Sequence, residues 1–599
     1  MAADTIPSRF FAQGDAHPDT PAAHTRKDDA WTSLSWREYT GLTRKVARAL
    51  IALGVQAGQA TCILGFNRVE WVTFAIGTQA VGAAPAGIYT TCSPTEVQYI
   101  VHHAEAAVVL VEDAAQFAKL AQEREHLPLL RHVVLMQGAR VDDPLALTWD
   151  EFLARGEATT EAAVDARLRE IPEDATATYI YTSGTTGPPK AVMLSHRNVL
   201  WTADTITSLM HFTPADTMLS YLPLSHIAEQ LISMYGPVVL GNQVYFAESL
   251  EKLPGNLKEV QPTIFFGVPR IWEKFHAAVR AKLGAVTGPK KHLLAWAMGV
   301  ARRVHALANR GASPPALLGL QYQLAQRLVF RKLKAALGLA NVKVCSSGAA
   351  PIAKEVLEFF SGLDLVVHEV YGQSEDCGPT STNYPGATRF GTVGRPLAGV
   401  EVRLADDGEI LVRGTNVFKG YFKDPAATAE TLIDGWLHSG DLGAIDAEGY
   451  LHITGRKKEI IITAGGKNVA PKNIEAALKQ HPLVEEAVVI GDRRKFLSAL
   501  LTLQMPAATA WLAQHAPGGE VLVADGVHPA IVQELQTWVE KANQEFARVE
   551  HVRKFRVLPR SLMQEHDELT PTLKLKRRNI DRNWSQLIES MYQASQEEA

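Results

Sequence analysis

Apolar and polar residues alternate in short blocks along the first third of the chain. Residues 61–65 form an apolar run typical of a buried strand, residues 68–81 place apolar side chains at helical spacing, and residues 107–111 form a second strand-like run. Between them, Ser93-Pro94-Thr95-Glu96 combines a capping serine, a first-turn proline and a reciprocal glutamate, which is a helix-start signal. Strands that alternate with helices predict a parallel sheet with helices on its faces.

The pattern changes twice further along the chain. Residues 284–337 have a long helical pattern rich in Ala, Leu, Lys and Arg and interrupted at 311–315, and we interpret its basic residues as a solvated helical face. Residues 400–421 instead alternate as short strands, and Asp406-Asp407-Gly408 and Asp434-Gly435 are turn signals typical of a small β-rich subdomain. After Gly455 the chain reads as a compact α+β region.

These patterns predict an α/β protein of two domains, because 599 residues exceed what one hydrophobic core usually supports. We expect a large N-terminal domain, residues 1–455, made of α/β subdomains plus a small β-rich subdomain. A small α+β C-terminal domain, residues 456–599, follows it, with the boundary between Gly455 and Lys458.

Composition narrows the class of protein. The net charge of −4 gives no electrostatic footprint for nucleic acid, so no nucleic-acid partner is expected. Residues 1–15 lack a hydrophobic signal core, and the most membrane-like stretch, residues 71–89, reads as a buried helix and a following strand. The cytoplasm is the expected location, and loose attachment to the inner face of a membrane stays open. Four widely separated cysteines suit a reducing compartment: Cys62, Cys92, Cys345 and Cys377.

One loop carries candidate chemistry of its own. A strand-like run at 175–181 leads into Thr182-Ser183-Gly184-Thr185-Thr186-Gly187-Pro188-Pro189-Lys190. Glycines let backbone N–H groups converge on an anion, hydroxyls add donors and Lys190 adds a point charge, so the loop is suited to holding polyphosphate. The two prolines, and the lack of Ser or Thr after the lysine, distinguish it from a Walker loop. The alternative is an exposed Ser/Thr/Gly surface loop.

Six further segments accompany the loop in a fixed order. They are Leu222-Pro223-Leu224-Ser225-His226, Ser346-Ser347-Gly348-Ala349-Ala350-Pro351, Tyr371-Gly372-Gln373-Ser374-Glu375, Trp436-Leu437-His438-Ser439-Gly440-Asp441, Gly455-Arg456-Lys457-Lys458-Glu459 and Pro571-Thr572-Leu573-Lys574-Leu575-Lys576-Arg577. In this order, over nearly the whole chain, they resemble the adenylate-forming superfamily. Within it, the third and last segments and the run at 461–471 are most similar to AMP-forming long-chain fatty acyl-CoA synthetases of the bacterial and bubblegum-type group.

The resemblance implies an enzyme that uses ATP and Mg²⁺ to turn a medium- to long-chain fatty acid into acyl-AMP and then transfers the acyl group to coenzyme A. It implies that Thr182, Ser183, Gly184, Thr185, Thr186, Gly187 and Lys190 hold the β- and γ-phosphates. Tyr371 would stack on adenine beside the backbone of Gly348, Ala349 and Ala350, with Gly372 and Ser374 in the same nucleotide site.

The resemblance also assigns the remaining candidates. Asp441 would accept the ribose hydroxyls with help from Arg456, and Glu375 would bind Mg²⁺, which prefers oxygen ligands. Lys574, with Lys190 and Glu375, would be catalytic, and Lys458 would be the hinge of a mobile C-terminal domain. The acyl and CoA channel would involve His226, Trp272, Gly465 and Gly466.

Departures and alternatives accompany this assignment. Ala191 stands where glycine is common and Ser374 where threonine is commoner, and both keep the chemistry plausible. His226 could equally be a satisfied buried histidine. The alternatives for the whole chain are a fatty acyl-AMP ligase that delivers to a carrier protein and a non-catalytic binder of acyl groups or adenylates. Chain-length preference and oligomeric state are open.

Overall fold

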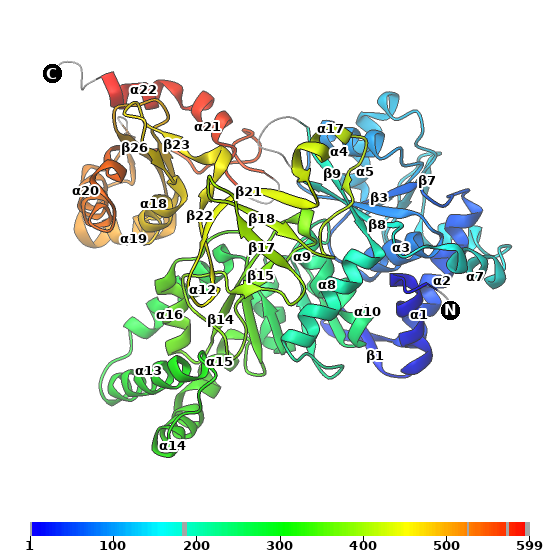
Figure 1. Cartoon of the computed structure of the whole chain (residues 1–599), viewed down its shortest axis with the longest axis horizontal. Helices are drawn as coiled ribbons and strands as arrows, with labels where there is room; N and C mark the ends of the chain where they lie inside the picture. Colours follow the sequence, from blue (N-terminus) through cyan, green and yellow to red (C-terminus); the bar gives the residue numbers. More distant parts are fainter. Residues whose placement is uncertain (1–2, 183–187, 524–525, 571–573, 594–599) are drawn as a thin grey trace.

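The computed structural model of the chain describes residues 3–182, 188–523, 526–570 and 574–593. Figure 1 shows two large α/β layers, a small sheet between them and a C-terminal body beside the second layer. This arrangement confirms the predicted α/β class, with a small β-rich subdomain and a small α+β C-terminal region.

The first layer contains the predicted parallel sheet. Its strands run parallel from β8 to β7, and β9 and β19 add an antiparallel edge. In sheet order they are β19 (Gly420–Tyr421), β9 (Lys190–Ser195), β8 (Thr176–Thr182), β4 (Ala84–Ile88), β3 (Ala60–Leu64), β5 (Val108–Val111), β6 (His132–Leu135) and β7 (Ala146–Leu147). Side chains alternate along a strand, so neighbouring residues of β3 pack into different hydrophobic cores. Ile63 belongs to the core on one face of the sheet, and Cys62 and Leu64 belong to the core on the other face.

Helices cover both faces of this sheet, as the sequence pattern predicts. The helix expected at 68–81 is α3, and every residue of it is buried. Ser93 caps α4 through the reciprocal bond with Glu96. The helices of this layer are α1 (Ile6–Ala16), α2 (Trp36–Ala52), α3 (Val69–Ala80), α4 (Pro94–His103), α5 (Ala114–Gln122), α6 (Trp149–Arg155) and α7 (Glu161–Glu170).

The second layer is built on a nine-stranded mixed sheet. In sheet order its strands are β16 (Arg395–Pro396), β15 (Ser381–Thr382), β14 (Val367–Tyr371), β13 (Val344–Ser347), β12 (Ile264–Phe266), β10 (Thr217–Ser220), β11 (Gln243–Phe246), β1 (Pro21–Lys27) and β2 (Ala30–Ser35). Its helices are α9 (Ile227–Glu229), α10 (Gly236–Leu240), α11 (Leu253–Val260), α12 (Pro269–Gly284), α13 (Pro289–Ala308), α14 (Ala316–Ala325), α15 (Arg331–Leu337) and α16 (Lys354–Gly362), while α8 (His196–Leu209) packs on β8 and β9 of the first layer. The break predicted at 311–315 separates α13 from α14, and a π-helical stretch, Gln326–Phe330, joins α14 to α15.

A small antiparallel sheet follows, with the predicted turns in place. Gly408 has φ +83°, and Asp434 and Gly435 have φ +51° and +77°, the left-handed values such hairpin turns require. The segment 400–421 is not wholly in this sheet, because Gly420 and Tyr421 pair with β9 of the first layer. Its strands are β17 (Glu401–Leu404), β18 (Glu409–Arg413), β20 (Leu432–Ile433), β21 (Trp436–Ile445) and β22 (Leu451–Arg456), with α17 (Pro425–Thr431) beside them.

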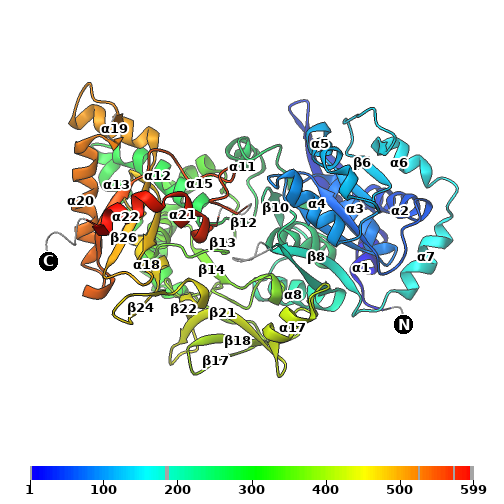
Figure 2. The same ribbon diagram turned by 90° about the horizontal axis from the view of Figure 1, so that it is seen from above.

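The C-terminal body has its own cores, made of residues from Ile461 onward. Helices pack on both faces of its sheet, those of residues 471–543 on one face and those of residues 577–593 on the other (Figure 2). Its strands are β23 (Ile461–Ile462), β24 (Asn468–Val469), β25 (Val484–Ile490), β26 (Leu497–Leu503), β27 (Leu522–Val523), β28 (Gly526–Val527) and β29 (Val552–Val557). Its helices are α18 (Pro471–Leu478), α19 (Met505–His515), α20 (Pro529–Asn543), α21 (Arg577–Asn583) and α22 (Ser585–Gln593).

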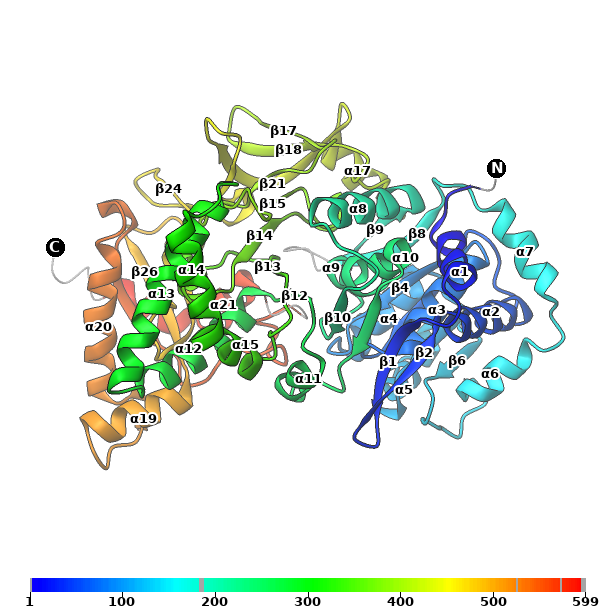
Figure 3. The same cartoon turned by 90° about the horizontal axis from the view of Figure 1, so that it is seen from below.

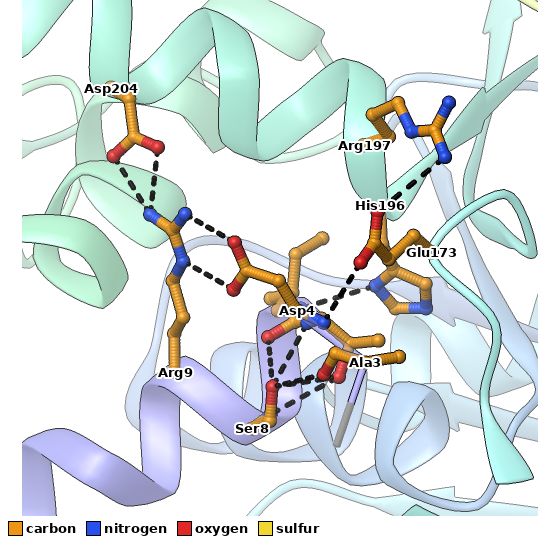
Figure 4. Close-up of polar contacts among 10 residues, drawn as sticks. Ala3, Asp4, Ser8, Arg9, Glu173, His196, Arg197 and Asp204 are labelled. Carbon is orange, nitrogen blue, oxygen red and sulfur yellow. Dashed lines mark hydrogen bonds and ion pairs between the residues drawn. The ribbon is translucent and has the colours of Figure 1, made fainter. Parts of the chain in front are cut away.

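Polar contacts fix the first helix to α8 (Figure 4). Arg9 donates to Asp4 and to both carboxylate oxygens of Asp204 on α8, at 2.8 Å for each Asp204 oxygen. The backbone N–H of Ile6 donates to Nδ1 of His196, the first residue of α8. Among the described helices, none combines the length and the apolar character needed to cross a bilayer.

Candidate active site

The candidate phosphate loop connects the antiparallel strands β8 and β9. Thr182 ends β8 and Lys190 begins β9, and the two residues are register partners. Ser183, Gly184, Thr185, Thr186 and Gly187 lie outside the described residues. Ala191 is fully buried in the sheet, so the extra methyl group is accommodated there.

Tyr421 connects Lys190 to Glu375, a link that the sequence motifs do not contain. Because β19 pairs with β9, the ring of Tyr421 lies beside Lys190, with Nζ 4.9 Å from the ring centroid. The Tyr421 hydroxyl donates to Oε1 of Glu375 at 2.8 Å. Asp424, the N-cap of α17, lies 3.9 Å from Lys190 Nζ. The β19–β9 pairing thus places Tyr421 in contact with both the Lys190 cation and the Glu375 carboxylate.

The next motifs sit at the carboxyl ends of two paired parallel strands, β13 and β14. Gly348 has little room, since an added Cβ would lie 3.0 Å from the Val370 oxygen. Ala349 has φ +70°, a left-handed conformation that is uncommon for a residue with a side chain. Ala349 and Ala350 are exposed at this edge. Ser374 is buried and opens a 3₁₀ turn, Ser374–Asp376.

Gly372 is required by close packing of the backbone. A Cβ at this position would lie 1.6 Å from the carbonyl oxygen of Gly378, so the loop must move to admit any side chain. We therefore expect Gly372→Ala to lower the free energy of unfolding by at least about 1–3 kcal/mol. Gly299→Ala is the control, because nothing lies within 4 Å of a Cβ there in α13. Thermal melts that showed equal stability for the two variants would contradict the packing argument.

Asp441 is the centre of a buried polar group. It is 7% exposed, and its carboxylate accepts from the Tyr371 hydroxyl at 3.0 Å and from Nε of Arg456 at 2.8 Å. Asp441 and Arg456 are register partners in the β21–β22 hairpin, which explains their contact. Burial raises the pKa of Tyr371 well above its usual range, and the neighbouring Asp441 carboxylate adds to the effect.

Lys574 brings a second cation to this group from the C-terminal body. The Lys574 side chain remains in contact with solvent. Nearby protein atoms still remove part of its hydration, and this desolvation lowers the pKa of Lys574 to about 8. The positive charges of Arg456 and Lys472 act in the same direction, and the Asp441 and Glu375 carboxylates oppose them. Lys574, on the C-terminal body, therefore lies within electrostatic range of Asp441 and Glu375.

His226 lies near Lys574 and caps α9. Its Nδ1 accepts from the backbone N–H of Ala228 at 3.2 Å. Burial first, and then the charge of Lys574, lower the His226 pKa to about 4, so the imidazole is neutral at pH 7.

Trp272 and the two glycines predicted for the acyl and CoA channel lie on different bodies of the chain. Trp272 is fully buried in an aromatic cluster with Phe265 and Phe360, and its Nε1 donates to the Ser346 carbonyl at 3.2 Å. It therefore supports the strand that carries the alanine-rich motif. Gly465 and Gly466 form the exposed turn between β23 and β24, on the C-terminal body.

Lys458 lies in the short connection between the bodies. It is exposed within a 3₁₀ turn, Lys457–Glu459, directly after β22. A cavity of about 2060 Å³ separates α12 and α16 from α18 and α20, and it is lined by residues such as Arg270, Phe359, Gln480 and Trp538. The predicted motif residues do not line it among the described residues, so it is a space between bodies and not the candidate site.

The predicted site residues do not include three residues with buried polar groups in the same site, although two of the three stand within the quoted motifs. Asp376 is fully buried, and desolvation raises its pKa well above the usual range, while it accepts from the backbone N–H of Gln373 at 2.7 Å. In the sequence, Asp376 directly follows the predicted Glu375. This second acidic residue was the signal that could have identified Asp376 as part of the site. Ser347 Oγ and Gln373 Nε2 are buried with no hydrogen-bond partner among the described residues. Such groups suit a ligand that supplies the missing partners.

Comparisons with known proteins agree with this geometry. The long-chain-fatty-acid–CoA ligase FadD15 of Mycobacterium tuberculosis is 36% identical over 598 residues, covering 98% of this chain and 97% of the relative. The long-chain-fatty-acid–CoA ligase ACSBG2 of Xenopus laevis is 35% identical over 622 residues, covering 98% of this chain and 84% of the relative.

Solved structures share the fold at lower identity. The anthranilate–CoA ligase AuaEII in complex with anthranoyl-AMP superposes with a TM-score of 0.72 at 20% identity, covering 97% of this chain and 98% of that one. The adenylation domain of a carboxylic acid reductase from Segniliparus rugosus, in complex with AMP and a carboxylic acid, gives 0.74 at 21% identity, with 98% and 94% covered.

Two family models match separate parts of the chain. The model of the AMP-binding enzyme matches residues 10–422, and the model of the AMP-binding enzyme C-terminal domain matches residues 458–596. The matched segments include Lys190, Tyr371 and Glu375 in the first and Lys574 in the second. The chain belongs to the AMP-binding enzyme family.

Proposed function

We propose that this chain is an ATP-dependent long-chain fatty acid–CoA ligase. The observation that carries the proposal is the buried Asp441, which accepts hydrogen bonds from Tyr371 and Arg456 and lies within electrostatic range of Lys574 on the other body. Two relatives that match it over 98% of its length are named long-chain-fatty-acid–CoA ligases. The substrates are a medium- to long-chain fatty acid, ATP and coenzyme A.

The reaction has two steps in one site. The fatty-acid carboxylate attacks the α-phosphorus of ATP, the bond to the β-phosphate breaks, and acyl-AMP and pyrophosphate form. The thiol of coenzyme A then attacks the acyl carbonyl and AMP leaves with the bonding electron pair. The first step joins two anions, so positioning and charge neutralisation should dominate its catalysis.

The site residues then have proposed roles. Thr182, the loop at 183–187 and Lys190 hold the β- and γ-phosphates, and Lys574 neutralises charge that develops at the α-phosphate. Tyr371 stacks on adenine beside Gly348, Ala349 and Ala350, with Gly372 and Ser374 shaping the same site. Asp441 accepts the ribose hydroxyls, and Arg456 orients it through the 2.8 Å bond.

Mg²⁺ fits this proposal through Glu375. Within the described residues, no group of three or more His, Cys, Asp or Glu side chains is arranged to hold a metal by itself. Mg²⁺ commonly uses one or two carboxylates together with substrate phosphates, and Glu375 is such a carboxylate, oriented by Tyr421. When bound, the cation would neutralise phosphate charge.

The test of the function measures pyrophosphate release across a panel of carboxylic acids, with and without coenzyme A. We expect release that requires a fatty acid and continued turnover that requires coenzyme A. Turnover that depends on a carrier protein instead would identify a fatty acyl-AMP ligase. Binding of acids or adenylates with no pyrophosphate release would identify a non-catalytic binder.

Asp441→Ala should raise the KM for ATP by about ten- to a hundredfold, because buried ribose hydroxyls lose a charged acceptor. Tyr371→Phe keeps the flat ring but loses the hydroxyl that donates to Asp441, so we expect a smaller rise of a few fold. Tyr39→Phe, at a buried tyrosine of α2, is the control. Unchanged ATP kinetics in Asp441→Ala would exclude the ribose contact.

The proposal includes the domain boundary and the hinge. The buried cores contain either residues up to Leu451 or residues from Ile461 onward, and none mixes the two sets among the described residues. This separation supports domains at 1–455 and 456–599, with Lys458 as the hinge. His226, Trp272, Gly465 and Gly466 are proposed for the acyl and CoA channel. We place the enzyme in the cytoplasm.

A further inference from the structure

The helical hairpin of α13, α14 and α15 exposes an apolar face. Leu317, Leu320, Leu324 and Leu328 are 70%, 65%, 49% and 46% exposed, and the first two are the most exposed large apolar residues described. Their spacing of three, four and four residues follows one side of a helix. Soluble proteins rarely expose such a contiguous apolar row unless it contacts something.

The same hairpin carries an unbalanced charge. Residues 284–340 contain nine Lys and Arg residues and no Asp or Glu. Only Lys334 forms an ion pair with a described acidic residue, Asp364, which leaves eight of the nine without one. Arg327, Arg331 and Lys332 are exposed beside the leucine row. A solvated helical face would explain the basic residues. It does not explain why four leucines beside them are exposed.

The hairpin is held rigidly in this position. Asp364, which follows α16, is buried and accepts from His305 at 3.0 Å, Gln326 at 2.5 Å and Lys334 at 2.7 Å. The Tyr322 hydroxyl donates to the same carboxylate. One acidic residue therefore braces α13, α14 and α15, and the exposed row is a fixed feature of the surface. Figure 1 shows α14 at the lower edge of the molecule, away from the small sheet, and Figure 3, seen from below, shows α13 and α14 side by side and facing the viewer.

We propose that this face docks the enzyme on an anionic lipid bilayer. Leucines on one side of a helix, beside Lys and Arg and without acidic residues, match the apolar and anionic layers of a membrane surface. A protein partner would need acidic groups to complement the exposed Arg327, Arg331 and Lys332, and a second copy of the hairpin offers no acidic residue. The inference goes beyond the proposed function, and it suits an enzyme whose acid substrate partitions into membranes.

The test is flotation of the full-length chain with vesicles of phosphatidylcholine and phosphatidylglycerol, and with vesicles of phosphatidylcholine alone. We expect binding to the anionic vesicles that weakens as salt is raised. Replacing Leu317, Leu320 and Leu324 with serine should weaken binding by about a hundredfold or more, from lost apolar burial. Replacing Arg327, Arg331 and Lys332 with glutamine should weaken it by about a hundredfold, since each cation contributes near the surface.

Matched controls change equally exposed residues elsewhere. Leu129, Leu250 and Ile433, 46%, 53% and 42% exposed, are replaced with serine, and Lys27, Arg131 and Arg140 with glutamine. We expect both controls to float like the wild type, with melting curves confirming that all variants fold. A wild type that stays soluble, or a leucine variant that floats normally, would overturn the proposal. A second outcome would also overturn the proposal. In it, sedimentation velocity shows dimers of the wild type that the leucine variant loses, while the leucine variant still floats with the vesicles.

Failure of this proposal and failure of the proposed function are distinguishable. Pyrophosphate release on an acid dissolved in buffer should be the same in the leucine variant and the wild type, because the hairpin carries none of the proposed site residues. Loss of vesicle binding with retained ligase activity concerns only the docking face. Absent ligase activity with retained vesicle binding concerns only the function.

Discussion

Replacing Lys574 with alanine is expected to slow acyl-adenylate formation by about a hundred- to a thousandfold, the effect typical of one preorganised electrostatic contact. Conversion of supplied acyl-AMP to acyl-CoA should continue near the wild-type rate. The reason is electrostatic, because Lys574 lies within range of the Glu375 and Asp441 carboxylates in this arrangement and is proposed to neutralise charge at the α-phosphate in the first step. Single-turnover assays of the two half-reactions provide the measurement.

Lys576→Ala is the matched control for this prediction. Lys576 lies two residues away, and its Nζ is 2.5 Å from Asp567. Its loss should leave adenylation nearly intact. Equal losses in both half-reactions of Lys574→Ala would argue against an adenylation role, and Lys576 would become the candidate.

The pKa of Lys574 predicts a pH dependence as well. In the free enzyme the pKa is lowered to about 8, so the side chain is mostly charged at pH 7 and loses its proton as the pH rises through 8. Adenylation kcat/KM, which reports groups of the free enzyme, should fall above that pH. The fall should be absent from the residual activity of Lys574→Ala.

Lys458→Pro should block the second half-reaction. ATP with Lys574, and then coenzyme A, must approach the same site, so the C-terminal domain has to turn between the steps. Proline fixes φ near about −65° at the proposed hinge and should hold the domain in the arrangement that places Lys574 in the site. First-turnover pyrophosphate release should then be near normal, and acyl-CoA formation severely slowed.

Lys458→Ala separates this conformational effect from the loss of the side chain. Lys458 is exposed, so the alanine variant should carry out both steps. Thioester formation at the wild-type rate in a folded Lys458→Pro variant, with folding checked by a melting curve, would mean that the hinge is another residue.

Local signals were enough to predict the elements. The capping box at Ser93, the turn at Asp434-Gly435 and the helical spacing of α3 each follow from interactions within a few residues. Pairings between distant strands could not be predicted in this way. Tyr421 reaches Lys190 and Glu375 only because β19 crosses from the small sheet's segment to the first layer.

Irregular strand geometry limited the site prediction further. Counting back from the β21–β22 turn pairs Asp441 with Gly455, but a bulge near Leu442 shifts the register by one residue and brings Arg456 opposite Asp441. Exposure was also invisible in the sequence. Trp272 is buried in an aromatic cluster, while the leucines of α14 face outward, although both segments show ordinary helical apolar patterns.

The β21–β22 hairpin has a thermodynamic consequence. Arg456 holds Asp441 through its side chain, and its backbone leads within two residues to Lys458. Linkage requires that if nucleotide binding at Asp441 favours one domain orientation, that orientation favours nucleotide binding by the same factor. A variant locked in one orientation should therefore change its ATP dissociation constant, even though residue 458 touches no nucleotide. The β21–β22 hairpin therefore couples nucleotide binding at Asp441 to the domain orientation set near Lys458.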